Sequence, residues 1–128
     1  MRFFERKFTK LARQHQMSNM EDLNFYESVY ALAREIPVGR VTSYGALARA
    51  LGRAGAARMV GYAMGYAGKA TPPVPAHRVL NSQGKLSGKA AFGHPMLMQE
   101  LLEAEGIQVR NDRVVDFKTV FWDPLKEL

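Results

Sequence analysis

The chain has 128 residues, a length that suits one compact domain and is short for two. It contains no cysteine, so disulfides, thiolate metal sites and any mechanism that needs a thiol nucleophile are excluded. No apolar run approaches the roughly 20 residues of a membrane span, and the basic N-terminus lacks the h-region of a signal peptide. We therefore expect a soluble, cytoplasmic protein that does not contact membranes.

The charge is unevenly distributed along the chain. The net charge is +6 and the pI about 9.8, which favours a polyanionic partner. Between Glu35 and Glu100 there is no acidic residue, and this stretch predicts a phosphate-binding surface, the alternative being chance segregation on a solvated surface. Its basic residues are Arg40, Arg49, Arg53, Arg58, Lys69, Arg78, Lys85 and Lys89.

Residues 1–24 are predicted to form a basic N-terminal extension, and residues 25–128 the folded domain. Four apolar residues of the extension could line one helical stripe, so both a docked helix and a loose basic arm remain open. These four residues are Phe3, Phe4, Phe8 and Leu11.

The first clear helix is predicted to begin at Asn24 as N-cap and to end before Pro37 and Gly39. Its apolar residues recur at helical spacing and predict a core-facing side. They are Phe25, Val29, Leu32, Ala33 and Ile36.

An extended step at residues 41–43 leads into a short helix over residues 44–51, which Thr42 or Ser43 can cap and Gly52 can end.

A second helix is expected over residues 56–66, with Arg58 on its outward side and Ala57, Val60, Ala63 and Met64 inward. Two helices joined by a glycine-containing turn are typical of a helix-turn-helix, although such pairs also occur in proteins that do not bind DNA. Their position inside the acid-free stretch favours DNA binding.

Three prolines keep residues 68–75 extended, and residues 81–89 are predicted to form a turn and a basic loop. The last strong helix is predicted to have Pro95 at its first position and Gly106 as its stop. Its predicted apolar stripe is Met96, Leu97, Leu101 and Leu102.

Residues 107–109 and 114–117 predict a small hairpin or wing, after which Phe121 and Trp122 pack the tail onto the body. The expected fold is mostly α with a small β element and a helix-turn-helix of the winged-helix type.

Four segments carry a family resemblance. They read, in order, IPVGRVTSYGALA at residues 36–48, AARMVGYAM at 56–64, PAHRV at 75–79 and LLEAEG at 101–106. This ordered series, from about Phe25 to Ile107, resembles the DNA-binding domain of the O6-alkylguanine-DNA alkyltransferases, and implies the fold of their C-terminal domain.

In that family the third segment is Pro-Cys-His-Arg-Val, and its cysteine accepts the alkyl group. Ala76 stands there in this chain. A methyl side chain has no lone pair, so it cannot act as a nucleophile. The chain therefore resembles the alkyltransferase-like proteins, which lack the cysteine, and we expect no catalytic residue, no cofactor and no metal.

The resemblance implies roles for residues of the helix pair. Tyr44 matches the tyrosine that presses on the phosphate beside the target nucleotide, and Arg58 matches the arginine that enters the stack in place of an extruded base. A half-buried packing tyrosine and a phosphate-binding arginine are the alternatives. Ala57 and Gly61 would allow close approach to the minor groove or close helix packing, and Arg49 is a further expected DNA contact.

His77 and Glu105 match the pair that activates the cysteine in the transferases. Without a thiol we expect them to form a structural pair, with Arg78 tying the segment to neighbouring backbone. No function is predicted for His15 or His94.

A lesion pocket is implied near Ala76, Val79 and the loop that holds Ser87, Gly88 and Lys89. Lys89 occupies the position of a family tyrosine, and a basic residue there could contact the electron-rich edge of a flipped guanine. The family's loop asparagine before the cysteine segment is missing from residues 68–73.

The predicted function is non-enzymatic recognition of O6-alkylguanine in double-stranded DNA by a monomer. The lesion would be flipped and flagged for nucleotide-excision repair. Two alternatives remain: alkyl transfer to a non-cysteine acceptor such as His77, and a DNA-binding or regulatory protein without lesion specificity.

Overall fold

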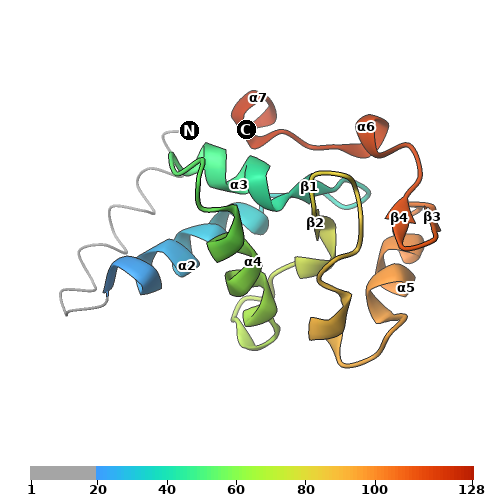
Figure 1. The fold of residues 1–128 in the computed structure, drawn as a ribbon, viewed down its shortest axis with the longest axis horizontal. Coiled ribbons are helices and arrows are strands. Elements are labelled where there is room, and N and C mark those ends of the chain that lie inside the picture. Colours follow the sequence, from blue (N-terminus) through green and yellow to red (C-terminus); the bar gives the residue numbers. More distant parts are fainter. Residues whose placement is uncertain (1–19) are drawn as a thin grey trace.

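The computed structural model describes residues 20–128, and their side chains from Leu23 onward (Figure 1). The predicted extension therefore lies outside the described residues except for its last five positions. The helices are α2 (Met20–Ala33), α3 (Tyr44–Ala50), α4 (Ala57–Gly65), α5 (Leu97–Ala104), α6 (Phe117–Val120) and α7 (Pro124–Glu127), with 3-10 turns η1 (Ala67–Lys69), η2 (Ala76–Arg78) and η3 (Lys89–Phe92). The strands are β1 (Thr42–Ser43), β2 (Val79–Leu80), β3 (Val109–Arg110) and β4 (Arg113–Val114).

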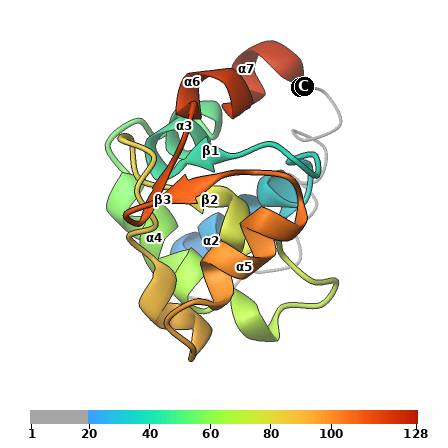
Figure 2. The ribbon, with the colours of Figure 1, turned by 90° about the vertical axis from the view of Figure 1, so that its right-hand side faces the viewer.

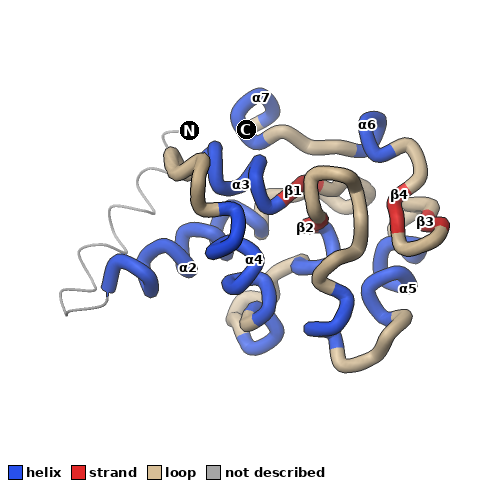
Figure 3. Tube along the Cα trace, in the orientation of Figure 1, coloured by secondary structure: helices blue, strands red, loops and turns tan. Residues whose placement is uncertain are grey.

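The architecture confirms the predicted fold class, since helices dominate and the strands are short (Figure 3). Within the described residues, no helix has the length and apolar character needed to cross a membrane. The same residues bring no three potential metal-binding side chains together.

The first described helix, α2, differs from the prediction at both ends. It begins at Met20 rather than after Asn24, so Asn24 is an internal residue and the predicted N-cap is wrong. It ends at Ala33, yet Ile36 still reaches the core with only 2% of its surface exposed. The apolar spacing identified the buried face correctly because that spacing depends on helical periodicity, whereas Asn24 resembles a cap only when residues 20–23 are read as part of the arm.

Helices α3 and α4 form the predicted helix-turn-helix. Ser43 caps α3, since its hydroxyl oxygen accepts a hydrogen bond from the backbone N–H of Ala46. Gly52 has φ +77° in the turn, a left-handed conformation that glycine adopts without strain.

Helix α2 supports this pair at two points. The Arg53 guanidinium in the turn lies 4.5 Å from the centre of the Phe25 ring, and the Tyr30 hydroxyl donates to the Ala63 carbonyl at 2.7 Å. The helix pair is thus held on a buried scaffold.

A parallel pairing that the sequence did not predict joins distant segments. Strand β1 pairs with β2 in the register Thr42 to Val79 and Ser43 to Leu80. This pairing sets the start of α3 beside the segment that follows Ala76. On its other side, Val41 exchanges backbone hydrogen bonds with Val120 and Trp122, and Trp122 is buried as predicted.

Helix α5 corrects the prediction at its start. It begins at Leu97, so Pro95 lies before the helix rather than at its first position. Met98 and Leu102 are the residues that it buries, whereas Met96 is 45% exposed. Met96 was wrongly placed in the stripe because it precedes the first helical residue, and Met98 takes the buried position instead. Gly106 ends it with φ +86°, as predicted.

The predicted hairpin is present as β3 and β4, and its two turn residues, Asn111 and Asp112, both have positive φ. The N–H of Leu86 donates to the Asp112 carbonyl, so the loop of residues 81–89 runs along the hairpin. The short helices α6 and α7 were not predicted. Asp123 caps α7 by accepting from the N–H of Leu125.

Candidate nucleic-acid interface

A small apolar cavity lies between the helix-turn-helix, the η2 segment and α5. Its volume is about 230 Å³, below the roughly 300 Å³ at the lower end of pockets for drug-sized ligands, so it suits a ligand no larger than a single base. Its lining residues are Tyr44, Gly61, Met64, Gly65, Ala76, Gly88, Ala90, Ala91, Phe92 and Met98.

Tyr44 and Gly88 pack tightly against each other in the cavity wall. A Cβ atom added to Gly88 would lie 2.8 Å from the Tyr44 hydroxyl oxygen, closer than Cβ atoms come to other atoms in proteins, so one of the two would have to shift. Glycine at this position therefore allows the loop of residues 81–89 to approach the start of α3. Tyr44 itself is half-buried and is the first residue after the Ser43 cap.

Two exposed arginines stand on the helix-turn-helix. Arg58 is the second residue of α4, and Arg49 lies in the last turn of α3 with Nη1 3.4 Å from a Cβ built on Gly45. In the part of the chain that the structure describes, neither guanidinium forms an ion pair. Helix α4 also lacks a side-chain cap and an acidic residue in its first turn. The N-terminus of α4 therefore combines the positive end of a helix dipole with an unpaired cation.

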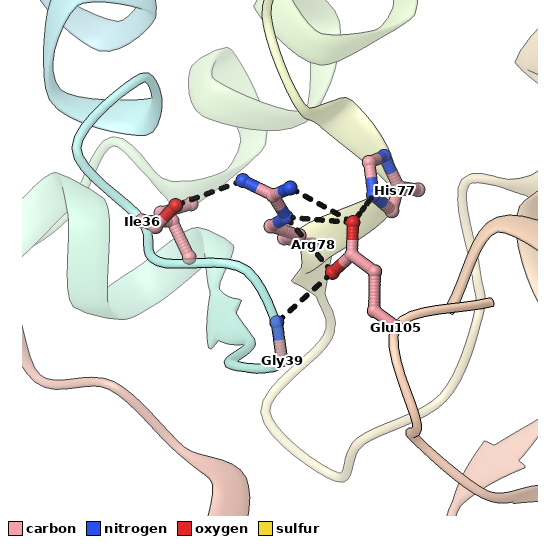
Figure 4. Close-up of polar contacts among 5 residues, drawn as sticks. All are labelled: Ile36, Gly39, His77, Arg78 and Glu105. Atoms are coloured by element: carbon pink, nitrogen blue, oxygen red, sulfur yellow. Dashed lines mark hydrogen bonds and ion pairs between the residues drawn. The ribbon is translucent and has the colours of Figure 1, made fainter. Parts of the chain in front are cut away.

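Behind the cavity, Glu105 accepts hydrogen bonds from three directions (Figure 4). Its Oε2 atom lies 2.7 Å from Nε2 of His77 and 2.8 Å from Nη2 of Arg78, and Oε1 accepts from the backbone N–H of Gly39 at 3.1 Å. Arg78 also donates from Nη1 to the Ile36 carbonyl at 2.9 Å. The predicted His77 and Glu105 pair and the predicted Arg78 tie to backbone are therefore both present.

The charge state of Glu105 follows from these contacts. Burial alone raises the pKa of the carboxyl, but the hydrogen bonds from Arg78, His77 and Gly39 outweigh it and lower the pKa to about 2. Glu105 is therefore ionised at neutral pH, and it fixes the η2 segment against residues 36–39 and the end of α5.

The cavity brings together only some of the predicted pocket residues. Ala76 and Gly88 line it, while Val79 is buried in the core and Ser87 is exposed outside it. Lys89 is not among the lining residues, and its Nζ pairs with Asp112 at 2.6 Å. A lesion-reading role for Lys89 stays a prediction.

Two residues expected at a DNA groove lie on α4. Gly61 lines the cavity, and a Cβ added to it would meet nothing within 4 Å, so close packing does not require glycine there. Ala57 was predicted to face inward, but it is only half-buried. Its neighbour Ala56 is the buried residue at the start of this helix.

Part of the cavity wall was missed by sequence reasoning. Phe92 and the alanines before it, Ala90 and Ala91, come from η3 directly after the predicted loop, and Met98 comes from α5. The run of small residues after Lys89 was the available signal, because small side chains leave space open beside a loop.

The fold and the site together define a winged-helix-like helix-turn-helix domain with a small apolar cavity behind its second helix. The chain belongs to the family of the DNA-binding domain of 6-O-methylguanine DNA methyltransferase, whose family model matches residues 24–107.

Two curated relatives match this chain over most of their own length. The chain is 37% identical over 94 residues to alkyltransferase-like protein 1 of Schizosaccharomyces pombe, which is 73% of this chain and 86% of the relative. It is 38% identical over 101 residues to a DNA base-flipping protein of Vibrio parahaemolyticus, covering 78% of this chain and 97% of the relative.

A solved structure confirms the fold. The S. pombe alkyltransferase-like protein in complex with damaged DNA containing O6-carboxymethylguanine superposes with a TM-score of 0.68 at 34% identity, over 77% of this chain and 94% of that one.

Proposed function

We propose that this protein is a non-enzymatic sensor of O6-alkylguanine in duplex DNA. It turns the damaged nucleotide out of the helix, holds the base in the apolar cavity and presents the complex to nucleotide-excision repair.

The observation that carries the proposal is the combination of an intact cavity with a residue that cannot react. Ala76 lines the cavity where a nucleophile would have to stand, and the chain has no cysteine elsewhere. Meanwhile the Glu105 contacts that fix the Ala76 segment are complete. A site with a fixed wall and no acceptor atom binds a ligand without consuming it.

The groups around the cavity have complementary tasks in turning out a base. Tyr44 stands in the cavity wall, where it can press on the phosphate beside the target nucleotide. Arg58 is exposed at the start of α4 and forms no ion pair with the acids that the structure describes, so its guanidinium can fill the gap left in the stack. Filling that gap recovers part of the few kcal/mol that unstacking costs.

The relatives support a damaged-DNA ligand. The S. pombe relative is described in complex with DNA that carries O6-carboxymethylguanine, and the Vibrio relative is named for base flipping. The family match at residues 24–107 includes all of the residues that line the cavity.

The decisive measurement is the ratio of affinities for O6-methylguanine and guanine duplexes of the same sequence at one stated salt concentration. We expect a clear preference for the lesion. Equal affinities would contradict lesion recognition and favour a general DNA-binding protein.

Mass spectrometry of the protein after incubation with the lesion duplex tests the absence of chemistry. We expect an unchanged protein mass and intact O6-methylguanine in the recovered DNA. A methyl adduct, for instance on His77, would show alkyl transfer instead.

The link to excision repair is tested by reconstituting incision on a lesion duplex. We expect the protein to increase incision near O6-alkylguanine, and the Arg58→Ala variant to increase it less.

A further inference from the structure

The hairpin carries three basic residues in one row. Arg110 in β3 lies directly opposite Arg113 in β4, and Arg113 forms a further bridge with Lys85 from the loop of residues 81–89. Residues directly opposite each other in antiparallel pairs project from the same face, about 5 Å apart. The backbone register therefore sets three cations side by side; we call Lys85, Arg110 and Arg113 the basic row.

Burial confirms which face they occupy. The alternate residues Leu86, Val109 and Val114 point inward and pack in the core with α5. Arg110, Arg113 and Lys85 are all exposed. The opposite face of the hairpin thus anchors the basic row rigidly to the body of the domain.

The three cations have no counter-charge among the side chains described from Leu23 onward. No ion pair there involves any of them, although Asp112 lies between the two arginines in the chain and pairs with Lys89 instead. Like charges directly opposite in a two-stranded pair destabilise it. An anion bound between them would relieve this repulsion.

A groove accompanies the row. It has a volume of about 500 Å³ and is lined by all three cations together with Asn111, Val114 and Val115. A shallow, cationic groove fits a solvated polyanion better than an apolar ligand.

The basic row is continuous with the proposed lesion site. The loop that supplies Lys85 continues to Gly88, which packs on the Tyr44 hydroxyl in the cavity wall. The hairpin turn is directed toward the side of the molecule on which α4 and this loop lie (Figure 2). A DNA strand that reached the cavity from this side would therefore have the hairpin on the same side of the molecule.

We propose that the basic row is a second DNA contact, which binds the phosphate backbone beside the flipped nucleotide. This inference rests on the proposed function for its position relative to the lesion. It predicts that the footprint of the protein extends from the helix-turn-helix across the loop of residues 81–89 to the hairpin.

The test compares Arg110→Gln/Arg113→Gln with a charge-matched control, Lys118→Gln/Lys126→Gln, whose residues are exposed on α6 and α7. Affinity for both an O6-methylguanine duplex and its guanine counterpart is measured between 50 and 200 mM salt. Thermal unfolding verifies that each variant is folded.

Loss of two phosphate contacts lowers the salt slope of log K by about 1.8, so the wild type should lose roughly tenfold more affinity over this salt range than the arginine variant. The loss should be equal on both duplexes, because phosphate contacts carry no base information. The control variant should keep the slope of the wild type.

An unchanged slope for Arg110→Gln/Arg113→Gln overturns the inference and leaves an acidic protein surface as the occupant. Equal slope losses in both variants also overturn it, because they indicate a net-charge effect. Failure of the proposed function would give a different result, in which the wild type binds the O6-methylguanine and guanine duplexes with equal affinity. The salt slopes of log K on guanine DNA would still decide whether the basic row contacts phosphates.

Discussion

Five basic residues of the acid-free stretch form two groups that differ in their partners. One group is neutralised by acids that the chain supplies only after residue 100. The pairs are Arg78 with Glu105, Arg40 with Glu127 and Lys89 with Asp112. These contacts fasten the C-terminal part of the chain onto the middle.

The other group lies on the helix-turn-helix and has no ion-pair partner among the described side chains. Arg49 and Arg58 are exposed, and no acid within the described residues approaches either guanidinium. Net charge therefore does not show which basic residues are free to bind an anion. The proposed DNA contacts Arg49 and Arg58 are cations that no described acid reaches, and the two groups should respond differently to mutation.

The largest effect is expected from removing the acid at the centre of the neutralised group. Glu105→Ala leaves Arg78 as a part-buried charge without its partner and the Gly39 N–H without an acceptor. We expect a loss of about 3–5 kcal/mol in the free energy of unfolding. Urea denaturation measures it, with Glu100→Gln in the first turn of α5 as control, which should cost less than about 1 kcal/mol. A similarly small loss for Glu105→Ala would show that the contacts of Glu105 do not stabilise the fold.

The stabilising role of Glu105 should also make the free energy of unfolding depend on pH. Because the folded pKa of Glu105 is about 2 and its ordinary value is 4.5, the carboxylate contributes its full stabilisation above about pH 5. That contribution, roughly 3 kcal/mol, is lost as the pH falls through 4.5 toward 2.

Urea titrations at pH 7, 4 and 3 measure this dependence. Glu105→Gln cannot titrate at this position, so its stability should fall less than that of the wild type over the same range. Parallel pH profiles for the two proteins would refute the assignment.

In the unpaired group, replacing Arg58 and replacing Arg49 should reduce DNA affinity by different amounts. Arg58→Ala is expected to weaken binding to an O6-methylguanine duplex by roughly 10- to 100-fold, because it loses the group that fills the stack. Arg49→Ala should cost less and mainly reduce the salt dependence, as expected for a phosphate contact. Fluorescence anisotropy on the same duplex compares them. Equal losses would count against base flipping by Arg58.

The smallest effect concerns the contact between the loop and Tyr44. Gly88→Ala places a methyl group 2.8 Å from the Tyr44 hydroxyl oxygen, so the tyrosine must move. We expect about threefold weaker lesion binding, or ~0.6 kcal/mol, with unchanged binding of guanine DNA.

Gly68→Ala is the matched control for this change, because a Cβ at that position meets nothing within 4 Å. An equal effect of the two substitutions would mean that the contact between Gly88 and Tyr44 is not part of the lesion site.

Local signals were predicted best. The helix pair, its Ser43 cap, the Gly52 and Gly106 stops and the hairpin depend on neighbouring residues, and all are present. The errors are also local: α2 extends five residues further toward the N-terminus than predicted, and α5 begins two residues later than Pro95 suggested. Helix ends depend on a few marginal hydrogen bonds, so sequence patterns place them poorly.

The sequence by itself determined what the protein lacks and which groups it retains. The absence of cysteine, Ala76 within PAHRV and the presence of Tyr44, Arg58, His77 and Glu105 are all legible in the amino acids. Only the tertiary structure decided which cations remain free and which residues enclose the cavity. The parallel pairing of β1 with β2 and the Glu105 contacts join residues far apart in the chain. Such contacts depend on how elements pack, and no local pattern encodes them.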